Sequence, residues 1–135
     1  MPLLFVRHAW AGKRSEWEGD DRERPLDPRG GQQARELIER LASFPIEEIH
    51  TSPFARCVQT VSPLAAVRGL EPILREELGE ERQGREGTAL VRELAGRDVV
   101  ICGHGGLEEA LVDPPKWRKG AAFVVDEVLR VVTEV

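Results

Sequence analysis

The chain lacks long apolar runs, and this shortage excludes several classes of protein. No apolar segment approaches the length that crosses a bilayer, so we expect no membrane contact. The N-terminal residues also lack the basic region, long apolar run and small-residue cleavage site of a signal peptide. These two observations predict a cytoplasmic protein.

Cysteine and histidine are scarce as well. The two cysteines, Cys57 and Cys102, lie far apart and form no C-x-x-C pair, so we expect both to be reduced and buried. Three histidines are too few for a His-rich metal-binding tract. The composition therefore favours neither a disulfide framework nor a metal-binding protein.

Basic residues are outnumbered by acidic ones. The 19 Lys and Arg against 24 Asp and Glu give a net charge of −5, which disfavours general binding of nucleic acid. A small anionic ligand remains compatible, because a few focused arginines can build a positive pocket on an acidic protein. With 135 residues, 41% of them hydrophobic, and no internal repeat, we expect one domain over residues 1–135.

Strand-like and helical segments alternate along the chain. Apolar runs predict strands, and three- and four-residue apolar spacing predicts helices. The expected strands are residues 2–6, 46–50, 72–74, 98–102, 121–125 and 128–132, and the expected helices are residues 28–43, 53–68, 88–94 and 107–111. Residues 12–27 and 75–88 read as loops. This order predicts an α/β fold, a three-layer α/β/α sandwich with a mostly parallel central sheet and an antiparallel pair at its end.

Polar residues follow two of the expected strands directly. Arg7 and His8 end the first strand, and His104 follows residues 98–102 between glycines that let a ligand approach the backbone. Because parallel strands place their carboxyl ends at one edge of the sheet, we expect these side chains to converge there. Two polar residues that merely end a strand are the alternative.

Arg56 stands in the first turn of the helix that we expect Ser52 to cap and Pro53 to open. A cation is unfavourable there, since the helix N-terminus already carries partial positive charge. An anion at the same place would interact favourably with the helix dipole, the free backbone N–H groups and the guanidinium together. An exposed arginine paired to a nearby glutamate is the alternative.

Two arginines and two histidines around a helix start suit a tetrahedral dianion, and a phosphoryl group is the obvious candidate. Cys57 lies inside a helix and Cys102 inside a strand, so neither is well placed for nucleophilic attack. A neutral histidine can attack phosphorus itself and form a covalent phosphohistidine.

These residues resemble the signature of the histidine phosphatase superfamily. The matching segments, in order, are Val6–Ala9, Arg24–Gly30, Gln33-Ala34, Thr51–Thr60 and Val100–Gly105. The short chain is similar to the compact phosphohistidine phosphatases of the SixA type. It also resembles the phosphatase-like domain attached to some Nudix hydrolases, notably at Arg56–Thr60 and Pro63–Ala65, although no Nudix box is present.

The resemblance implies a phosphoglycerate-mutase-like fold and a role for each matching residue. His8 would be the nucleophile, while Arg7, Arg56 and His104 would bind the phosphoryl oxygens. No metal or other cofactor is implied, because the arginines supply the positive charge. Glu76 falls where many members carry a general acid. Its neighbour Glu77 is the second candidate, and a solvated loop glutamate is the alternative for both.

The sequence thus predicts a metal-independent phosphatase working through phosphohistidine on His8, with a phosphohistidine protein as the first candidate substrate. A small-molecule phosphomonoesterase acting on a nucleotide or sugar phosphate is the alternative. A non-catalytic module that binds a phosphorylated ligand is a third interpretation, and a metal site on His8, His104 and a carboxylate is a fourth. The sequence does not indicate an oligomeric state.

Overall fold

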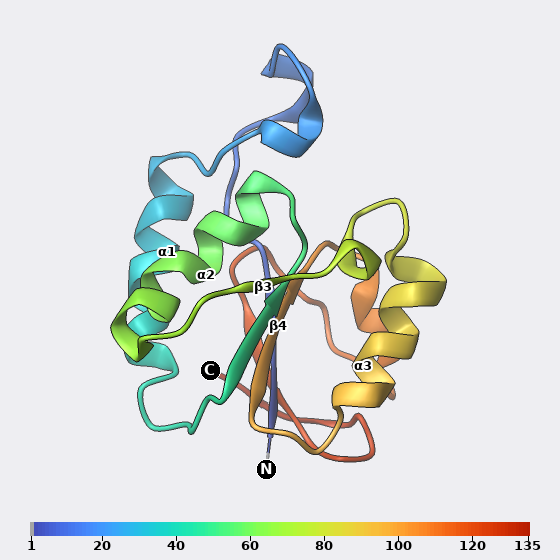
Figure 1. Ribbon diagram of the computed structural model, residues 1–135. Coiled ribbons are helices and arrows are strands. Elements are labelled where there is room, and N and C mark those ends of the chain that lie inside the picture. Colours follow the sequence, from blue (N-terminus) through green and yellow to red (C-terminus); the bar gives the residue numbers. More distant parts are fainter. Residues whose placement is uncertain (1) are drawn as a thin grey trace.

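A six-stranded mixed sheet forms the centre of the protein (Figure 1). The structure is a computed structural model that describes residues 2–135. In spatial order the strands are β3 (Ile73–Leu74), β2 (Glu48–Thr51), β4 (Val99–Gly103), β1 (Leu3–Arg7), β5 (Ala122–Val125) and β6 (Val131–Glu134). The first four are parallel, β5 runs antiparallel to β1, and β6 runs antiparallel to β5.

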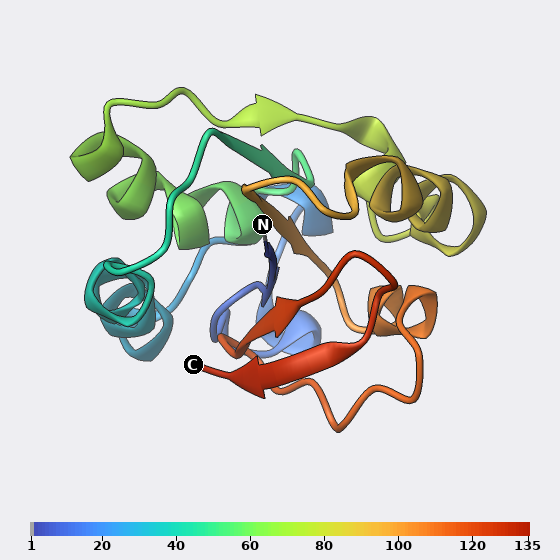
Figure 2. The same cartoon turned by 90° about the horizontal axis from the view of Figure 1, so that it is seen from below.

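Helices cover both faces of this sheet. Helices α1 (Pro28–Arg40) and α2 (Ala55–Arg68) lie on one face, and α3 (Thr88–Leu94) lies on the other (Figure 2). Successive residues of β1 therefore enter two separate cores. Leu4 and Val6 pack on the α1 and α2 side, while Leu3 and Phe5 pack on the α3 side. The predicted three-layer α/β/α sandwich is confirmed, including its antiparallel pair of strands.

Helix α1 begins as the sequence predicts and packs directly on the chain that follows β1. The side chain of Asp27 caps it by accepting from the backbone nitrogen of Gly30, and Pro28 occupies the first turn. A Cβ atom on Gly30 would lie 1.9 Å from the carbonyl oxygen of Trp10, so only glycine permits this approach. The helix is thereby held beside the carboxyl end of β1.

Helix α2 begins two residues later than predicted. It starts at Ala55, and Phe54 is its N-cap residue without a side-chain cap. The hydroxyl of Ser52 accepts a hydrogen bond from the backbone nitrogen of Phe54, and it also lies 2.9 Å from His104 Nε2. Ser52 is therefore engaged with the neighbouring strand end instead of capping the helix.

The C-terminal third departs from the expected boundaries. Residues 107–111 form only a single 3₁₀ turn, Leu107–Ala110, because Gly106 has a left-handed φ of 110° and Leu111 is already extended. The last strand is shifted to Val131–Glu134, since the turn before it is longer than expected. Asp126 Oδ1 accepts from two backbone nitrogens of that turn, those of Val128 and Arg130.

The two expected loops contain short helical turns. Residues 12–27 include 3₁₀ turns at Arg14–Glu16 and Asp21–Glu23 and form the projection at the top of Figure 1. Residues 75–88 include a 3₁₀ turn at Glu76–Leu78 and a π-helical turn at Gln83–Gly87.

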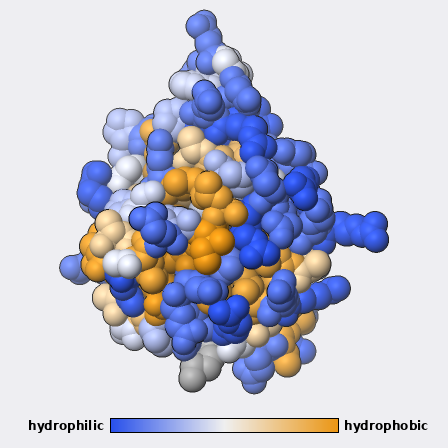
Figure 3. All heavy atoms as spheres, in the orientation of Figure 1, coloured by the Kyte–Doolittle hydropathy of each residue, from blue (hydrophilic) through white to orange (hydrophobic). Residues whose placement is uncertain are grey.

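In the view of Figure 3 the surface is mostly polar, and apolar side chains gather over β3 and the end of α2. The exposed large apolar side chains of these two elements are Val67, Ile73 and Leu74. Within residues 2–135, no helix is both long and apolar enough to cross a membrane.

Candidate active site

His8 lies immediately after β1 with its ring orientation fixed. Its backbone nitrogen donates to the carbonyl oxygen of Gly103 at 3.1 Å, and Nδ1 lies 2.8 Å from the carbonyl oxygen of Ala9. A carbonyl oxygen only accepts, so Nδ1 carries the proton and Nε2 keeps its lone pair. The ring thus presents a free nitrogen nucleophile on the side away from its anchor.

The surroundings of His8 keep its ring neutral. The side chain is 5% exposed, and this burial is the main reason that its pKa falls to about 3. Electrostatic interaction with His104, Arg56 and Arg7 lowers the pKa further, against the opposing hydrogen bond to Ala9. The neighbouring arginines therefore favour the neutral form, but burial contributes more.

Arg7 packs against the glycine turn that follows β4. Its Nη1 donates to the carbonyl oxygen of Trp117 at 2.8 Å. A Cβ atom on Gly105 would lie 2.8 Å from Arg7 Nη2, so glycine at this position lets the guanidinium approach the backbone closely. The ends of β1 and β4 are therefore in direct contact, as the parallel register of the two strands requires.

Arg56 is fully buried in the first turn of α2 and reaches the 12–27 loop. Its Nη1 donates to the carbonyl oxygen of Asp21 at 2.8 Å, and its Nη2 lies 3.1 Å from Asp21 Oδ2 and 3.3 Å from Glu80 Oε2. The alternative interpretation of Arg56 was an exposed arginine paired with a glutamate. Arg56 does have a glutamate partner, Glu80, but its guanidinium is buried.

His104 is also fully buried, and neighbours on three sides hold it. Gln83 Oε1 accepts from its backbone nitrogen at 3.2 Å, and the Phe54 ring meets its ring edge-on with centroids 4.7 Å apart. Ser52 accepts from Phe54, so the proton of its own hydroxyl is free to be donated to His104 Nε2. In that arrangement Nδ1 of His104 carries the proton and is free to donate. The centroids of the His8 and His104 rings lie 5.5 Å apart.

Three buried donors of this cluster have no hydrogen-bond partner. They are Arg7 Nε, Arg56 Nε and His104 Nδ1, among six buried polar side-chain atoms without a partner in residues 2–135. A buried unpaired donor costs on the order of 1–3 kcal/mol, so natural structures seldom keep several together without a purpose. Their gathering around one neutral histidine is the arrangement that an oxyanion with several acceptor oxygens would satisfy.

A pocket of about 630 Å³ opens in front of His8. Residues 10–15 and Arg24 form one wall, and Arg7, Glu80, Gly105 and Lys119 complete the lining. Arg24 is held there by hydrogen bonds to the carbonyl oxygen of Ala11 and to Asp21 Oδ1. The 12–27 loop therefore belongs to the site, a role that the sequence left open.

The structure does not bring Glu76 or Glu77 into this pocket. Glu76 is exposed and pairs with Arg22 at 3.2 Å, and Glu77 pairs with Arg75 at 2.9 Å. Glu80 lines the pocket instead, with Oε1 2.6 Å from Arg14 Nη2 and Oε2 3.6 Å from His104 Nδ1. Sequence reasoning missed Glu80, because only the turns at Glu76–Leu78 and Gln83–Gly87 decide which glutamate of this acidic segment faces inward.

Both cysteines are fully buried in the core beneath α2, as expected. Neither lines the pocket in front of His8. In the part of the chain that the structure describes, no group of three or more His, Cys, Asp and Glu side chains is arranged to hold a metal ion.

Solved structures support the fold assignment. The protein histidine phosphatase SixA in complex with tungstate superposes with a TM-score of 0.82 at 22% identity, covering 100% of this chain and 96% of that one. A protein from Agrobacterium tumefaciens described as a SixA phosphohistidine phosphatase gives a TM-score of 0.80 at 20% identity, with 99% and 96% covered. At these identities the likeness concerns the fold.

A sequence relative is more similar. The 8-oxo-(d)GTP phosphatase of Mycolicibacterium smegmatis is 38% identical over 118 residues, which cover 82% of this chain and 36% of the relative. The chain therefore spans little more than a third of that protein's length. Residues 3–88 match the model of the histidine phosphatase superfamily, branch 1. With the fold and the residues around His8 in agreement, the chain belongs to the histidine phosphatase superfamily.

Proposed function

We propose that the protein is a phosphatase in which His8 accepts the phosphoryl group on Nε2. The observation that carries this proposal is the hydrogen bond from His8 Nδ1 to the Ala9 carbonyl, combined with a pKa near 3. A neutral imidazole with its lone pair on Nε2 is the form that attacks phosphorus. At neutral pH the nucleophile needs no base to deprotonate it.

The reaction has two steps. In the first, a bond forms between Nε2 and phosphorus while the bond from phosphorus to the leaving oxygen breaks. The leaving oxygen keeps the electron pair and takes up a proton. In the second, water attacks the phosphohistidine, the P–N bond breaks, and inorganic phosphate leaves with His8 neutral again.

The buried donors stabilise the phosphoryl group during both steps. Arg7, Arg56 and His104 surround His8, and each keeps a buried nitrogen without a hydrogen-bond partner. Preorganised donors in a site that excludes water stabilise developing charge more strongly than donors in solution. These three residues would bind the equatorial oxygens, which spread charge as the bond to the leaving group breaks.

Glu80 is our candidate for the proton donor to the leaving oxygen, in place of Glu76. It is the carboxyl group that lines the pocket, and it lies beside Arg56 and His104. When protonated, this carboxyl group would donate its proton to the leaving oxygen as the bond to phosphorus breaks.

Two substrate classes fit this mechanism. The folds of the SixA proteins favour a phosphohistidine on another protein, and the mycobacterial relative favours a nucleotide. The relative is the more similar in sequence, at 38% identity against 22%. A proton donor in the pocket also suits a phosphate ester, whose leaving oxygen needs a proton more than a phosphoramidate nitrogen does. We therefore favour a small-molecule phosphate.

The proposal is tested by steady-state hydrolysis of p-nitrophenyl phosphate. The wild-type protein should turn over with and without a chelator, and His8→Gln should reduce kcat by at least about 10³-fold, because the nucleophile is lost. Ser62→Ala, on the same side of the sheet but without contact to the pocket lining, should remain active. Activity that survives His8→Gln would refute the mechanism, and loss of activity on chelation would refute its independence of metal.

A further inference from the structure

A second pocket, strongly basic, adjoins the first. It has a volume of about 640 Å³ and shares Arg7, Trp10 and Lys119 with the pocket in front of His8. Six of its lining residues are cations, and Glu134 is its single acidic residue. The six cations are Arg7, Arg29, Arg40, Lys116, Arg118 and Lys119. Such a concentration of positive charge is unexpected on a chain whose net charge is −5.

None of these six cations is neutralised by a side-chain carboxylate. In residues 2–135, no Asp or Glu oxygen comes within 4.0 Å of any of them. The arginines on the opposite wall of the His8 pocket behave differently. Arg14 and Arg24 both pair with the Asp21 carboxylate. On one side of His8 the arginines thus form ion pairs with carboxylates, whereas the six cations of the basic pocket form none within 4.0 Å.

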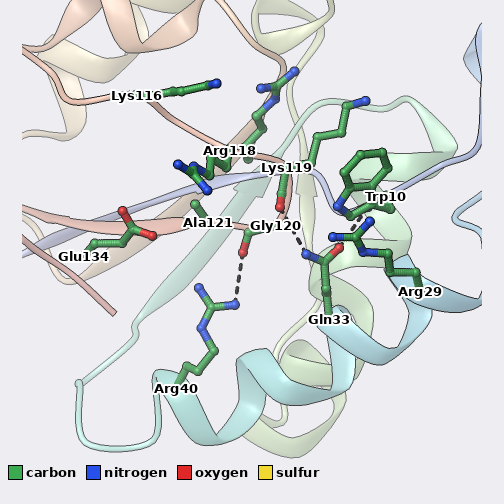
Figure 4. A pocket seen from close by; sticks show the side chains of 11 residues that line it. Trp10, Arg29, Gln33, Arg40, Lys116, Arg118, Lys119, Gly120, Ala121 and Glu134 are labelled. Carbon is green, nitrogen blue, oxygen red and sulfur yellow. Dashed lines mark hydrogen bonds between the residues drawn. The ribbon is translucent and has the colours of Figure 1, made fainter.

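Neutral groups hold several of these cations in place. The Trp10 ring has the Arg29 guanidinium carbon 4.2 Å and Lys119 Nζ 4.4 Å from its centre. Arg40 Nη1 donates to the carbonyl oxygen of Gly120 at 3.0 Å (Figure 4), and its Nε and Nη2 donate to the backbone oxygen of Val135 at 3.1 and 2.7 Å. An aromatic face or a carbonyl oxygen orders a cation without removing its charge.

The wall that carries Lys119 is itself anchored to α1. Gln33 accepts from the backbone nitrogen of Trp10 and donates to the carbonyl oxygen of Lys119, so one side chain joins both sides of the pocket. Figure 4 shows Arg29, Gln33 and Arg40 projecting from this helix toward the segment that carries Lys116, Arg118 and Lys119. Burial and the charges of Arg7 and Arg24 lower the pKa of Lys119, which reflects the crowding of like charges.

We propose that this basic pocket is a second anion subsite, which binds a further phosphate group of the same substrate whose reacting phosphoryl group lies at His8. The substrate class is then a small molecule with at least two phosphate groups. This inference rests on the function proposed above and narrows its substrate. Guanidinium forks recognise phosphate oxygens in pairs, and the pocket has the size of a small-molecule site.

The shared lining explains how one molecule would occupy both pockets. Arg7 lies beside His8 and also lines the basic pocket, so it can contact the reacting phosphoryl group and the next phosphate. Lys119 borders both pockets in the same way. A substrate with a single phosphate would leave the cations beyond Lys119 without an anionic partner. An acidic surface of a phosphoprotein is the competing occupant, but a pocket that shares Arg7, Trp10 and Lys119 with the catalytic one favours a small molecule.

The test compares substrates that differ in their second phosphate. ADP carries it through an anhydride, fructose 1,6-bisphosphate carries it on a separate ester, and p-nitrophenyl phosphate lacks it. The test variant is Lys116→Glu/Arg118→Glu, whose side chains are exposed and lie away from His8. The control is Arg85→Glu/Arg92→Glu, which makes the same charge change at exposed sites outside both pockets.

For the test variant we expect kcat/KM to fall at least about tenfold for ADP, for the bisphosphate, or for both, because charge-assisted hydrogen bonds are lost and repulsion is introduced. For p-nitrophenyl phosphate kcat/KM should change less than about twofold in the test variant. The control variant should keep the wild-type kcat/KM for all three substrates. A loss of kcat/KM for ADP would place the second phosphate in an anhydride, and a loss for fructose 1,6-bisphosphate would place it on a separate ester.

Two results would overturn the subsite. One is an equal change for all three substrates, and the other is a loss confined to a phosphohistidine protein assayed as a fourth substrate, which would make the pocket a protein-docking surface. Neither touches the proposed function, because p-nitrophenyl phosphate hydrolysis by the wild type and its loss in His8→Gln are measured in the same series. If His8→Gln hydrolyses p-nitrophenyl phosphate as fast as the wild type, the proposed function fails instead.

Discussion

Thr60 Oγ1 lies 2.9 Å from the backbone nitrogen of Ala9 and joins the chain just after β1 to helix α2. The same hydroxyl donates to the carbonyl oxygen of Arg56 at 2.6 Å. One buried side chain thus fixes both the turn that orients His8 and the helical turn that carries Arg56. We infer that Thr60 is a positioning residue, which acts on catalysis through its neighbours.

Thr60→Val tests this role. The variant leaves the Ala9 N–H buried without an acceptor, so the free energy of unfolding should fall by about 1–3 kcal/mol. The variant frees the backbone of Ala9, whose carbonyl oxygen orients the His8 ring. We therefore expect kcat to fall by a larger factor than KM changes. Urea denaturation and steady-state kinetics measure the two effects.

Thr60→Ser keeps the hydroxyl and should restore kcat. Ser62→Ala is the matched control, because Ser62 donates to the carbonyl of Val58 in the same helix but makes no contact with Ala9. A Thr60→Val enzyme with normal kcat, or one that Thr60→Ser fails to rescue, would show that the hydrogen bond to Ala9 does not position the nucleophile.

Glu80→Gln should separate substrates by their leaving groups. A general acid contributes about 10²- to 10⁴-fold when the leaving oxygen is strongly basic and much less when it leaves readily. We therefore expect kcat for an alkyl phosphate to fall by at least about 10²-fold and kcat for p-nitrophenyl phosphate by less than about tenfold. Glu76→Gln, in the exposed pair with Arg22, should leave both rates nearly unchanged. The reverse order, with Glu76 as the sensitive residue, would restore the sequence-based candidate.

The buried His8 makes the folded state sensitive to acid. Its pKa is about 3 in the folded protein against 6.5 for an ordinary histidine. Between these values the unfolded chain binds more protons than the folded one, so stability falls as pH falls. The slope from this residue is at most about 1.4 kcal/mol per pH unit.

His8→Gln removes this titration. Urea denaturation of both proteins at a series of pH values should show the variant gaining stability relative to the wild type as the pH drops below about 6.5. Stability curves that stay parallel across that range would mean that His8 is protonated in the folded protein, which would contradict a neutral nucleophile.

The convergence of the strand ends could be predicted from the sequence. Apolar runs identified β1 and β4, and the rule that parallel strands end at one edge placed Arg7 and His8 beside His104. The structure brings these residues together with Arg56, whose position in the first turn of α2 also followed from local pattern. Local patterns suffice where a single element sets the position of a side chain.

Other features depend on contacts between distant segments, and sequence patterns do not report them. Ser52 was expected to cap α2, but tertiary packing directs its hydroxyl to His104. The sequence does not show that Glu80 faces the pocket while Glu76 does not, because this depends on the turns at Glu76–Leu78 and Gln83–Gly87. The basic pocket joins Arg29 and Arg40 of α1 to residues 116–121, which lie at the other end of the chain.

The measurement that bears most directly on the central claim is the identity of the phosphorylated residue during turnover. The wild-type protein would be mixed with p-nitrophenyl phosphate, quenched in alkali, which preserves phosphohistidine, and digested for mass spectrometry. We predict a phosphoryl group on Nε2 of His8, formed within one turnover and missing in His8→Gln. Turnover without any phosphoenzyme, or a phosphoryl group on another residue, would contradict the account.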